Sequence, residues 1–178
     1  MKGIAKLLLL SLLAVPALSS CGGTPISVPL SDFSINIDVV ADTAGKVVYA
    51  ESPTEFQKSI LNVKSITLSG KMTYTTTTGS DTLTLTFYGS ANDPANRSSC
   101  TKIGSFFLCD PSGEKAISSQ GSFTKGVPTE ITLGSPNPDV LADGINNGRI
   151  WIGALVESSL SLNTTFEFTD MVAHVTLF

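Results

Sequence analysis

The sequence predicts an all-β protein, an antiparallel β-sandwich or partly open barrel with one short helix. Apolar and polar residues alternate with a period of two along most of the chain, as they do in half-buried strands. Glycine, proline, asparagine and aspartate interrupt this alternation at short intervals, which is typical of turns. A helical pattern occurs at residues 138–147. Roughly eight to ten short strands of this kind are typical of sandwiches and small barrels.

The N-terminal segment, residues 1–20, has the pattern of an export signal and not of a folded element. Lys2 and Lys6 make its start positive, and only Ser11 interrupts the apolar run 7–15. A transmembrane helix needs about 20 apolar residues, roughly twice the length of this run. The run therefore has the size of the apolar region of a signal peptide.

The segment ends in Leu18-Ser19-Ser20-Cys21. This motif resembles the lipobox of bacterial lipoprotein precursors, and the resemblance covers only the chain through Cys21. It implies that residues 1–20 are removed, that Cys21 is acylated, and that palmitate-type chains anchor the mature protein in a membrane. The alternative is ordinary secretory cleavage at Ala17-x-Ser19.

The resemblance also implies a location. Gly22 follows the cysteine where an aspartate tends to mean inner-membrane retention, so we expect the outer membrane of the cell envelope. Residues 21–30 are expected to be the lipidated N-terminus and a flexible tether, because Gly22-Gly23-Thr24-Pro25 is small and unlike packed chain. Residues 31–178 have the length of a single domain.

The charge of the chain argues against nucleic acid as a partner. Removal of residues 1–20 leaves 9 Lys and Arg against 15 Asp and Glu, a net charge of −6. Such a body repels phosphate and anionic lipid surfaces. The expected partners are the membrane, through the acyl chains, and an envelope protein or polysaccharide.

Cys100 and Cys109 remain once Cys21 is assigned to lipid. Outside the reducing cytosol, a disulfide between them is the first interpretation. It closes a loop of about ten residues and is expected to stabilise the fold by roughly 2.5–3 kcal/mol at most. One alternative is a pair of free or redox-active thiols, although redox pairs are normally spaced as C-x-x-C. Another is a metal site, which normally has closer cysteine spacing and further ligands.

The first half of the domain is expected to contain three strands before its clearest turn. Alternation predicts strands at 33–39 and 46–50. Residues 60–63 and 66–74 form one long strand whose apolar set changes from odd to even positions. A bulge near Lys64-Ser65 accounts for this change.

A hairpin is predicted next, in which Gly79-Ser80-Asp81 joins the end of that strand to a strand at 83–87. The threonines on both sides are interpreted as a solvated strand face, with ice or glycan binding as the alternative. Residues 89–115 are rich in turn residues, with a short strand at 103–108 between the cysteines. Short strands are also expected at 116–123 and 128–133.

The helix at 138–147 has start and stop signals. Asn137 is a suitable N-cap, Pro138 suits the first turn, and Gly148 ends the helix. The strand at 150–156 is apolar on both faces around Trp151, so we expect it to be central or covered.

Two further strands are expected at 160–168 and 171–178. Their apolar residues lie at even positions in the first strand and at odd positions in the second, and a turn or bulge at Thr169-Asp170 accounts for this change. Phe178 ends the chain as in outer-membrane barrel proteins. Thr176 and His174 break that pattern, however, and a barrel needs lipid-facing strands of about ten residues throughout.

Catalytic motifs are not evident. His174 is the only histidine, there is no G-x-S-x-G motif, and we interpret His174 as structural. The scattered aspartates leave open a pair for acid–base work. A calcium site would have to use the oxygen donors around the helix, but capping explains them more simply; these donors are Asp139, Asp143, Asn146 and Asn147.

The sequence therefore predicts a lipid-anchored envelope protein that is a non-enzymatic structural or interaction module, without a cofactor or metal. One alternative is a carrier that holds an apolar ligand or lipid in a half-barrel, with the helix as a lid. Another is an envelope glycan hydrolase that uses paired carboxylates.

Overall fold

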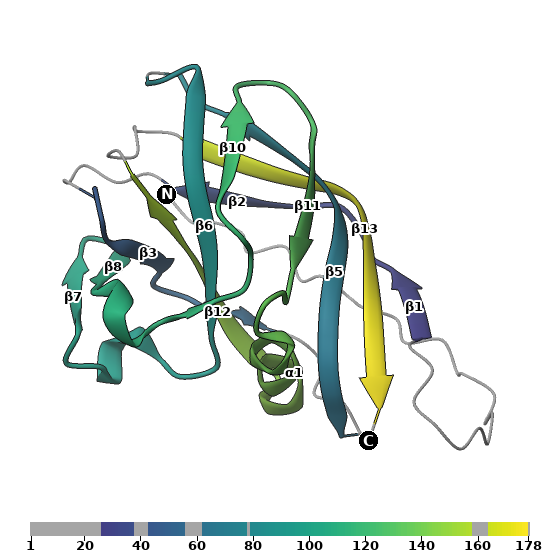
Figure 1. The fold of residues 1–178 in the computed structure, drawn as a ribbon. Coiled ribbons are helices and arrows are strands. Elements are labelled where there is room, and N and C mark those ends of the chain that lie inside the picture. Colours follow the sequence, from purple (N-terminus) through teal and green to yellow (C-terminus); the bar gives the residue numbers. More distant parts are fainter. Residues whose placement is uncertain (1–25, 38–42, 56–61, 78, 158–163, 178) are drawn as a thin grey trace, which may run out of the picture.

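The computed structural model describes residues 26–37, 43–55, 62–77, 79–157 and 164–177. Within them the chain forms two antiparallel sheets that face one another, and one α-helix (Figure 1). The predicted fold class, an all-β sandwich with one short helix, is confirmed, and one sheet is curled like half of a barrel.

Sheet A has five strands, in the order β1-β13-β5-β11, with β2 also paired to β13. Their bounds are Ile26–Pro29 (β1), Phe33–Ile37 (β2), Val63–Thr75 (β5), Thr129–Leu133 (β11) and Thr164–Leu177 (β13). Strand β13 is 14 residues long and pairs with β1, β2 and β5. The sheet is therefore organised around β13.

Sheet B has eight strands, in the order β10-β6-β12-β3-β8-β7, with β9 beside β6 and β4 beside β12. Their bounds are Val47–Ala50 (β3), Thr54–Glu55 (β4), Thr82–Ser90 (β6), Cys100–Ile103 (β7), Phe106–Cys109 (β8), Lys115–Ala116 (β9), Gly121–Thr124 (β10) and Arg149–Val156 (β12). Because β12 lies between β6 and β3, the prediction of a central strand around Trp151 is confirmed.

Aromatic side chains fill the space between the sheets. The Phe33 and Phe168 rings stack with centroids 4.6 Å apart, and Phe87 meets both Phe166 and Phe168 edge-on. All of these except Phe33 are at most 1% exposed. Most of the described residues that alternation assigned to buried strand faces thus belong to one continuous core.

Helix α1 (Pro138–Asn147) packs against β5, β12 and β6 at one end of the sandwich (Figure 1). Its close approach to β12 depends on Gly144, where a Cβ would lie 2.8 Å from the Cβ of Ile150. Gly148 ends the helix in the left-handed conformation, as predicted. Asn137 is the N-cap residue, as predicted, but its side chain makes no capping bond and instead donates from Nδ2 to the Ala116 carbonyl at 2.8 Å.

Both predicted irregularities in the long strands are confirmed. The β5–β13 register slips where Thr176 pairs with Ser65 but Leu177 pairs with Val63, so Lys64 is bulged. It slips again between Thr169 and Val172, where Asp170 has a φ of 54°.

The predicted hairpin around residues 79–81 is wrong. Strand β5 belongs to sheet A and β6 to sheet B, so this segment crosses between sheets. Strands β5 and β6 each bury one face in the same core, but from opposite sides. Two strands in facing sheets and two strands paired in one sheet show the same alternation, so the pattern alone does not distinguish them. The threonine run is also only partly solvated, because Thr76 is 6% exposed.

Three other boundaries differ from the expectations. Residues 26–29 of the expected tether form β1, paired with β13. The expected strand at 103–108 is a hairpin of β7 and β8, turned at Gly104 with a φ of 61°. The expected strand at 116–123 is divided into β9 and β10. Residues 21–25, 38–39, 60–61, 160–163 and 178 of the predicted segments lie outside the described residues.

Candidate functional site: a polar hollow beside the disulfide

The disulfide joins neighbouring strands at the edge of sheet B. Cys100 in β7 lies directly opposite Cys109 in β8, and their sulfurs are 2.03 Å apart. The predicted pairing is confirmed. Cys109 is fully buried, so the bond ties the edge strand β7 to β8, whose other side pairs with β3.

The outer face of sheet B carries a second apolar cluster. It consists of Val47, Tyr49, Phe107, Cys109 and Trp151. Since neighbouring residues of β3 belong to this cluster and to the main core, β3 is buried on both faces. Loop residues cover the cluster, and two of them are charged.

Those two residues, Arg97 and Glu114, form an ion pair over Tyr49. The Arg97 Nη1 donates to both Glu114 oxygens, at 2.6 and 2.5 Å, and the Tyr49 hydroxyl donates to Glu114 Oε2 at 2.7 Å. The guanidinium carbon lies 5.0 Å from the centre of the Tyr49 ring, within cation–π range. The Glu114 side chain is 2% exposed, so its charge is compensated by these neighbours and not by solvent.

Burial, and then the adjacent Glu114 carboxylate, raise the pKa of Tyr49 far above its ordinary value. The Arg97 Nε and Nη2 are buried and have no hydrogen-bond partner among the described residues. Because the guanidinium lies over the Tyr49 ring, its remaining stabilisation comes from the aromatic face. The three side chains together hold the loops at residues 97 and 114 against β3.

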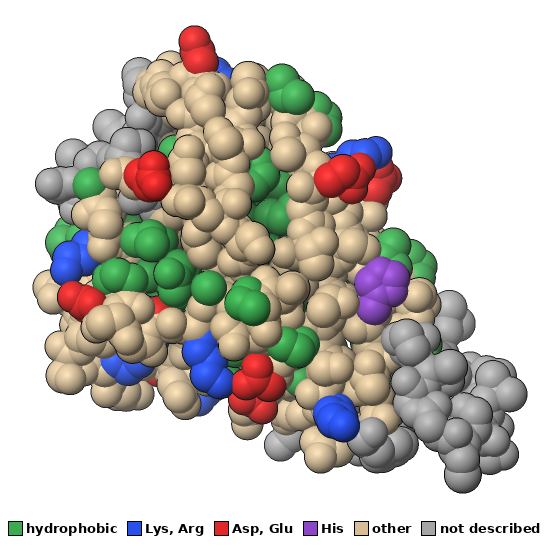
Figure 2. All heavy atoms as spheres, viewed as in Figure 1, with side chains coloured by type: hydrophobic (Ala, Val, Ile, Leu, Met, Phe, Trp, Pro, Cys, Tyr) green, Lys and Arg blue, Asp and Glu red, His purple; other side chains and the backbone are tan. Residues whose placement is uncertain are grey.

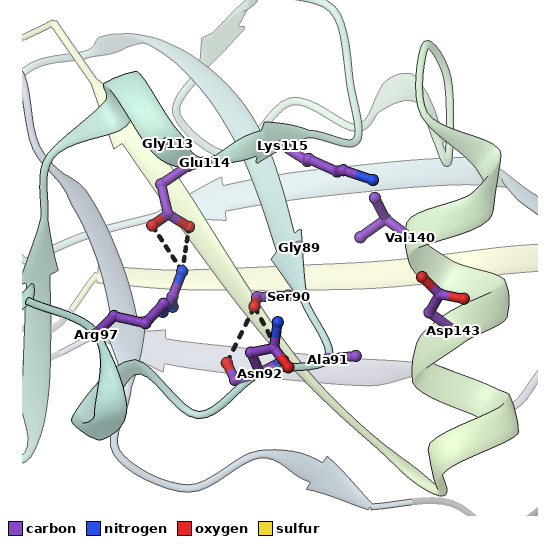
Figure 3. A pocket seen from close by; sticks show the side chains of 10 residues that line it. All are labelled: Gly89, Ser90, Ala91, Asn92, Arg97, Gly113, Glu114, Lys115, Val140 and Asp143. Atoms are coloured by element: carbon purple, nitrogen blue, oxygen red, sulfur yellow. Dashed lines mark hydrogen bonds and ion pairs between the residues drawn. The ribbon is translucent and has the colours of Figure 1, made fainter. Parts of the chain in front are cut away.

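A hollow of about 190 Å³ opens beside this ion pair, between the loops and α1 (Figure 3). Its walls come from the end of β6, both loops, and one face of the helix. Figure 3 shows Asp143 and Val140 on the helix facing Arg97 and Glu114 across the hollow. The lining residues are Gly89, Ser90, Ala91, Asn92, Arg97, Gly113, Glu114, Lys115, Val140 and Asp143.

Much of the charge around the hollow is already paired. Lys115 Nζ donates to Asp139 Oδ2 at 2.8 Å, which raises the pKa of Lys115 and lowers that of Asp139. Ser90 Oγ exchanges hydrogen bonds with the backbone of Asn92. In the described part of the chain, the Asp143 carboxylate and the Asn92 carboxamide make no hydrogen bond with protein.

The oxygen donors considered for calcium do not converge on one point. Asp139 binds Lys115, and the Asn146 carboxamide pairs with the backbone N–H and carbonyl of Val63 at 3.0 and 2.9 Å. Asn147 Nδ2 donates to the Asp143 carbonyl. The side chains of Asp139, Asn146 and Asn147 are therefore engaged with protein groups.

His174 also has structural partners. Its Nδ1 lies 3.0 Å from Ser27 Oγ in β1, and its Nε2 lies 3.0 Å from Ser69 Oγ in β5. The imidazole thus links three neighbouring strands of sheet A on its outer face. In Figure 2 the surface over β5 and β13 is mostly tan, the colour of the backbone and of side chains that are neither apolar nor charged.

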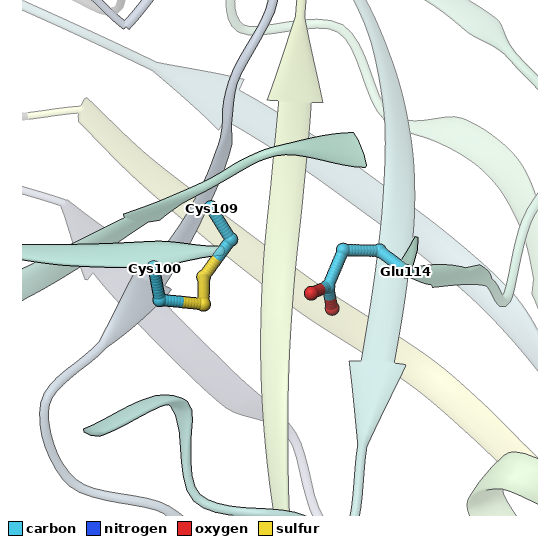
Figure 4. Close-up of side chains that lie close together, drawn as sticks. All are labelled: Cys100, Cys109 and Glu114. Carbon is cyan, nitrogen blue, oxygen red and sulfur yellow. A yellow bond between two sulfur atoms is a disulfide. The ribbon is translucent and has the colours of Figure 1, made fainter. Parts of the chain in front are cut away.

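The ligand atoms of Cys100, Cys109 and Glu114 lie within 4.8 Å of one another (Figure 4). The two sulfurs are bonded to each other, and the carboxylate accepts hydrogen bonds from Arg97 and Tyr49. With the disulfide formed, the two sulfurs and the Glu114 carboxylate are therefore all engaged with protein groups. Cys21, the predicted lipidation site, lies outside the described residues.

Comparison with known proteins gives little further guidance. No family model matches the chain, and no curated protein matches it. Among solved structures, one similar chain belongs to work titled "Bacillus endospore appendages form a novel family of disulfide-linked pili". It shares 15% identity, with a TM-score of 0.35, over 92% of this chain and 100% of that one. Both values are too low to indicate a shared function.

Sequence reasoning missed Tyr49, Arg97 and Glu114. The available signal was the run Val47-Val48-Tyr49, which is apolar on both faces and so predicts a strand covered on both sides. Nothing in the spacing pairs Arg97 with Glu114, because their approach depends on the two loops.

Proposed function

We propose that this protein is a lipid-anchored module of the bacterial cell envelope that acts through its surface, as a structural or interaction protein and not as an enzyme. Cys21 carries the acyl chains, and the folded domain is displayed at the outer membrane. Its partners are an envelope protein or a polysaccharide. Among the described residues, no helix has the length and apolar character needed to cross a membrane.

The observation that carries this proposal is the filled space between the sheets. A carrier needs an apolar cavity for its ligand. Here Phe87, Phe166 and Phe168 occupy that space and contact one another. Helix α1, the lid of the carrier hypothesis, buries Val140 and Leu141 in the same core. These contacts favour a scaffold over a carrier.

The hollow supports an interaction role over hydrolysis. Glu114 and Asp143 line it together, as a hydrolase with paired carboxylates would require. A catalytic carboxylate must reach its substrate, however, and the Glu114 oxygens accept two hydrogen bonds from the Arg97 guanidinium and one from the Tyr49 hydroxyl. The Glu114 side chain is also only 2% exposed. Glu114 is therefore better suited to hold the loops than to transfer protons.

The anchor is tested by feeding an alkyne analogue of palmitate to bacteria that express the full chain. We expect the wild type to acquire the label and to partition with detergent, and Cys21→Ala to lose both properties. A wild-type protein that is exported without label would contradict the anchor. Its recovered mass would then indicate whether cleavage occurs at Ala17-x-Ser19.

The interaction role is tested by placing a photo-crosslinking residue at Asn92, on the rim of the hollow, or at Glu130, on β11 of sheet A. We expect discrete adducts from position 92 and few from position 130. Native mass spectrometry of the detergent-released protein tests the carrier alternative, which requires a co-purifying lipid in addition to the acyl chains. Adducts at neither position would count against an interaction module.

A further inference from the structure

We infer that Cys100 is a thiol-exchange site. An external thiol opens the Cys100–Cys109 bond by attacking the Cys100 sulfur, becomes linked to it as a mixed disulfide, and releases Cys109. This inference goes beyond the proposed function and does not depend on the lipid anchor. It follows from the different burial of the two cysteines, from a groove beside Cys100, and from the direction in which a disulfide is attacked.

The two cysteines differ in their access to solvent. Cys109 is fully buried in the apolar cluster on the outer face of sheet B, whereas Cys100 at the start of β7 is partly exposed. Cys109 lies between Cys100 and Val47 of β3, which is also fully buried. Exchange depends on which sulfur a thiol can reach. A thiol in solution therefore meets Cys100 and not Cys109.

Cys100 lines an open groove of about 450 Å³, which shares no lining residue with the hollow beside α1. Two contacts hold the sides of this groove. Lys102 Nζ pairs with the Glu51 carboxylate, and Asp93 Oδ1 accepts a hydrogen bond from the backbone N–H of Ala95 at 2.9 Å. The groove therefore gives a thiol-bearing molecule a route to Cys100. Its lining residues are Glu51, Asp93, Ala95, Cys100, Lys102 and Phe107.

The position of the bond in the sheet also favours Cys100. A thiolate attacks a disulfide in line, along the extension of the S–S bond and opposite the leaving sulfur. In the described part of the chain, β7 is the last strand of sheet B. The line from Cys109 through Cys100 therefore leaves the sheet at its edge. The reverse line runs toward β3 and its buried Val47, so in-line attack on Cys109 is blocked.

The exchange balances without a further reactant. The external thiolate forms a bond to Cys100 Sγ, the bond between the two cysteine sulfurs breaks, and Cys109 leaves with the electron pair. The proton given up by the external thiol then neutralises the Cys109 thiolate. Because β7 and β8 remain paired, Cys109 stays next to the mixed disulfide and can expel the external thiol again. The site therefore holds a thiol covalently and reversibly.

The first measurement compares the two cysteines one at a time in the detergent-solubilised full-length protein. Cys109→Ser leaves Cys100 as a thiol, and Cys100→Ser leaves Cys109. Each variant is treated with N-ethylmaleimide, and labelling of the relevant peptide is followed by mass spectrometry. We expect Cys100 to react at least about tenfold faster than Cys109, because reactivity follows exposure. In urea the two rates should become equal, which controls for intrinsic reactivity.

The second measurement uses the wild type, so it holds even where a serine variant fails to fold. The protein is exposed briefly to mercaptoethanol, quenched with acid, and mapped by peptide mass spectrometry. We expect the mercaptoethanol adduct on Cys100, with Cys109 as the free thiol. An adduct on Cys109, equal adducts on both cysteines, no adduct on either, or equal labelling rates in the folded variants would overturn the inference.

Discussion

Arg97 donates two hydrogen bonds from Nη1 to Glu114, at 2.6 and 2.5 Å, across the loops on either side of the disulfide hairpin. The two side chains are 19% and 2% exposed. Removal of one member of a buried pair leaves the other charge without compensation, and this effect is larger than the net contribution of the intact pair. The stability of the domain should therefore be sensitive to the loss of either Arg97 or Glu114.

We expect Arg97→Ala to lower the free energy of unfolding by about 3 kcal/mol, because it leaves the Glu114 carboxylate buried with only the Tyr49 hydroxyl as a donor. Urea denaturation of the purified protein measures this loss. The double variant Arg97→Met, Glu114→Met should recover most of it, since no buried charge remains. A loss below about 0.5 kcal/mol in Arg97→Ala would show that solvent reaches the carboxylate.

Replacing both Cys100 and Cys109 with alanine should lower the free energy of unfolding by about 2.5–3 kcal/mol. This is the chain-entropy value for a loop of about ten residues. Denaturation of the wild type with and without dithiothreitol gives an independent measure. Equal midpoints in the two conditions, with the thiols shown to be free after reduction, would contradict this prediction.

Tyr49 should delay the alkaline titration of the protein. Burial and the Glu114 carboxylate raise its pKa in the folded state above the ordinary value near 10. Its stabilising contribution is therefore complete below pH 10 and is lost as the pH rises beyond that value. Tyrosinate absorbance should show tyrosine ionisation that is delayed until the protein unfolds, with a contribution from Tyr74, whose pKa burial also raises, and Tyr49→Phe should reduce the amplitude of that step. A wild-type titration complete before unfolding would refute the assignment.

Gly70→Ala tests the bulge in sheet A. A Cβ at position 70 would clash with the Met171 sulfur and lie 2.9 Å from the Thr169 carbonyl oxygen. We expect a loss of about 1–3 kcal/mol in unfolding free energy, the usual range for overpacking. Gly113→Ala is the matched control, because a Cβ there meets nothing within 4 Å. Equal stabilities for the two variants would mean that the bulge relaxes to admit the methyl group.

Local patterns in the sequence predicted several features correctly because local chemistry determines them. Gly148 ends the helix through its own backbone conformation. The bulges near Lys64 and at Asp170 follow from a change in which alternate positions are apolar. The Cys100–Cys109 bond followed from the small number of cysteines left once Cys21 was assigned.

Features that depend on distant parts of the chain were not predictable in this way. Residues 76–81 resemble a hairpin turn, and only the positions of β10 and β12 beside β6 show that this segment crosses between sheets. The Arg97–Glu114 pair requires two loops to meet over Tyr49. Val28 and its neighbours in β1 have too short an alternating pattern to identify the strand without its partner β13.

The pairing of β13 with β1, β2 and β5 has a consequence for the order of assembly. Sheet A joins residues 26–29 to residues 172–175, so its centre cannot form until both regions of the chain are available. Pairings between such distant residues are slow to form, because a long loop must close first. A chain synthesised from its N-terminus therefore completes sheet A only after β13 has been made, whereas none of the pairings in sheet B involves β13.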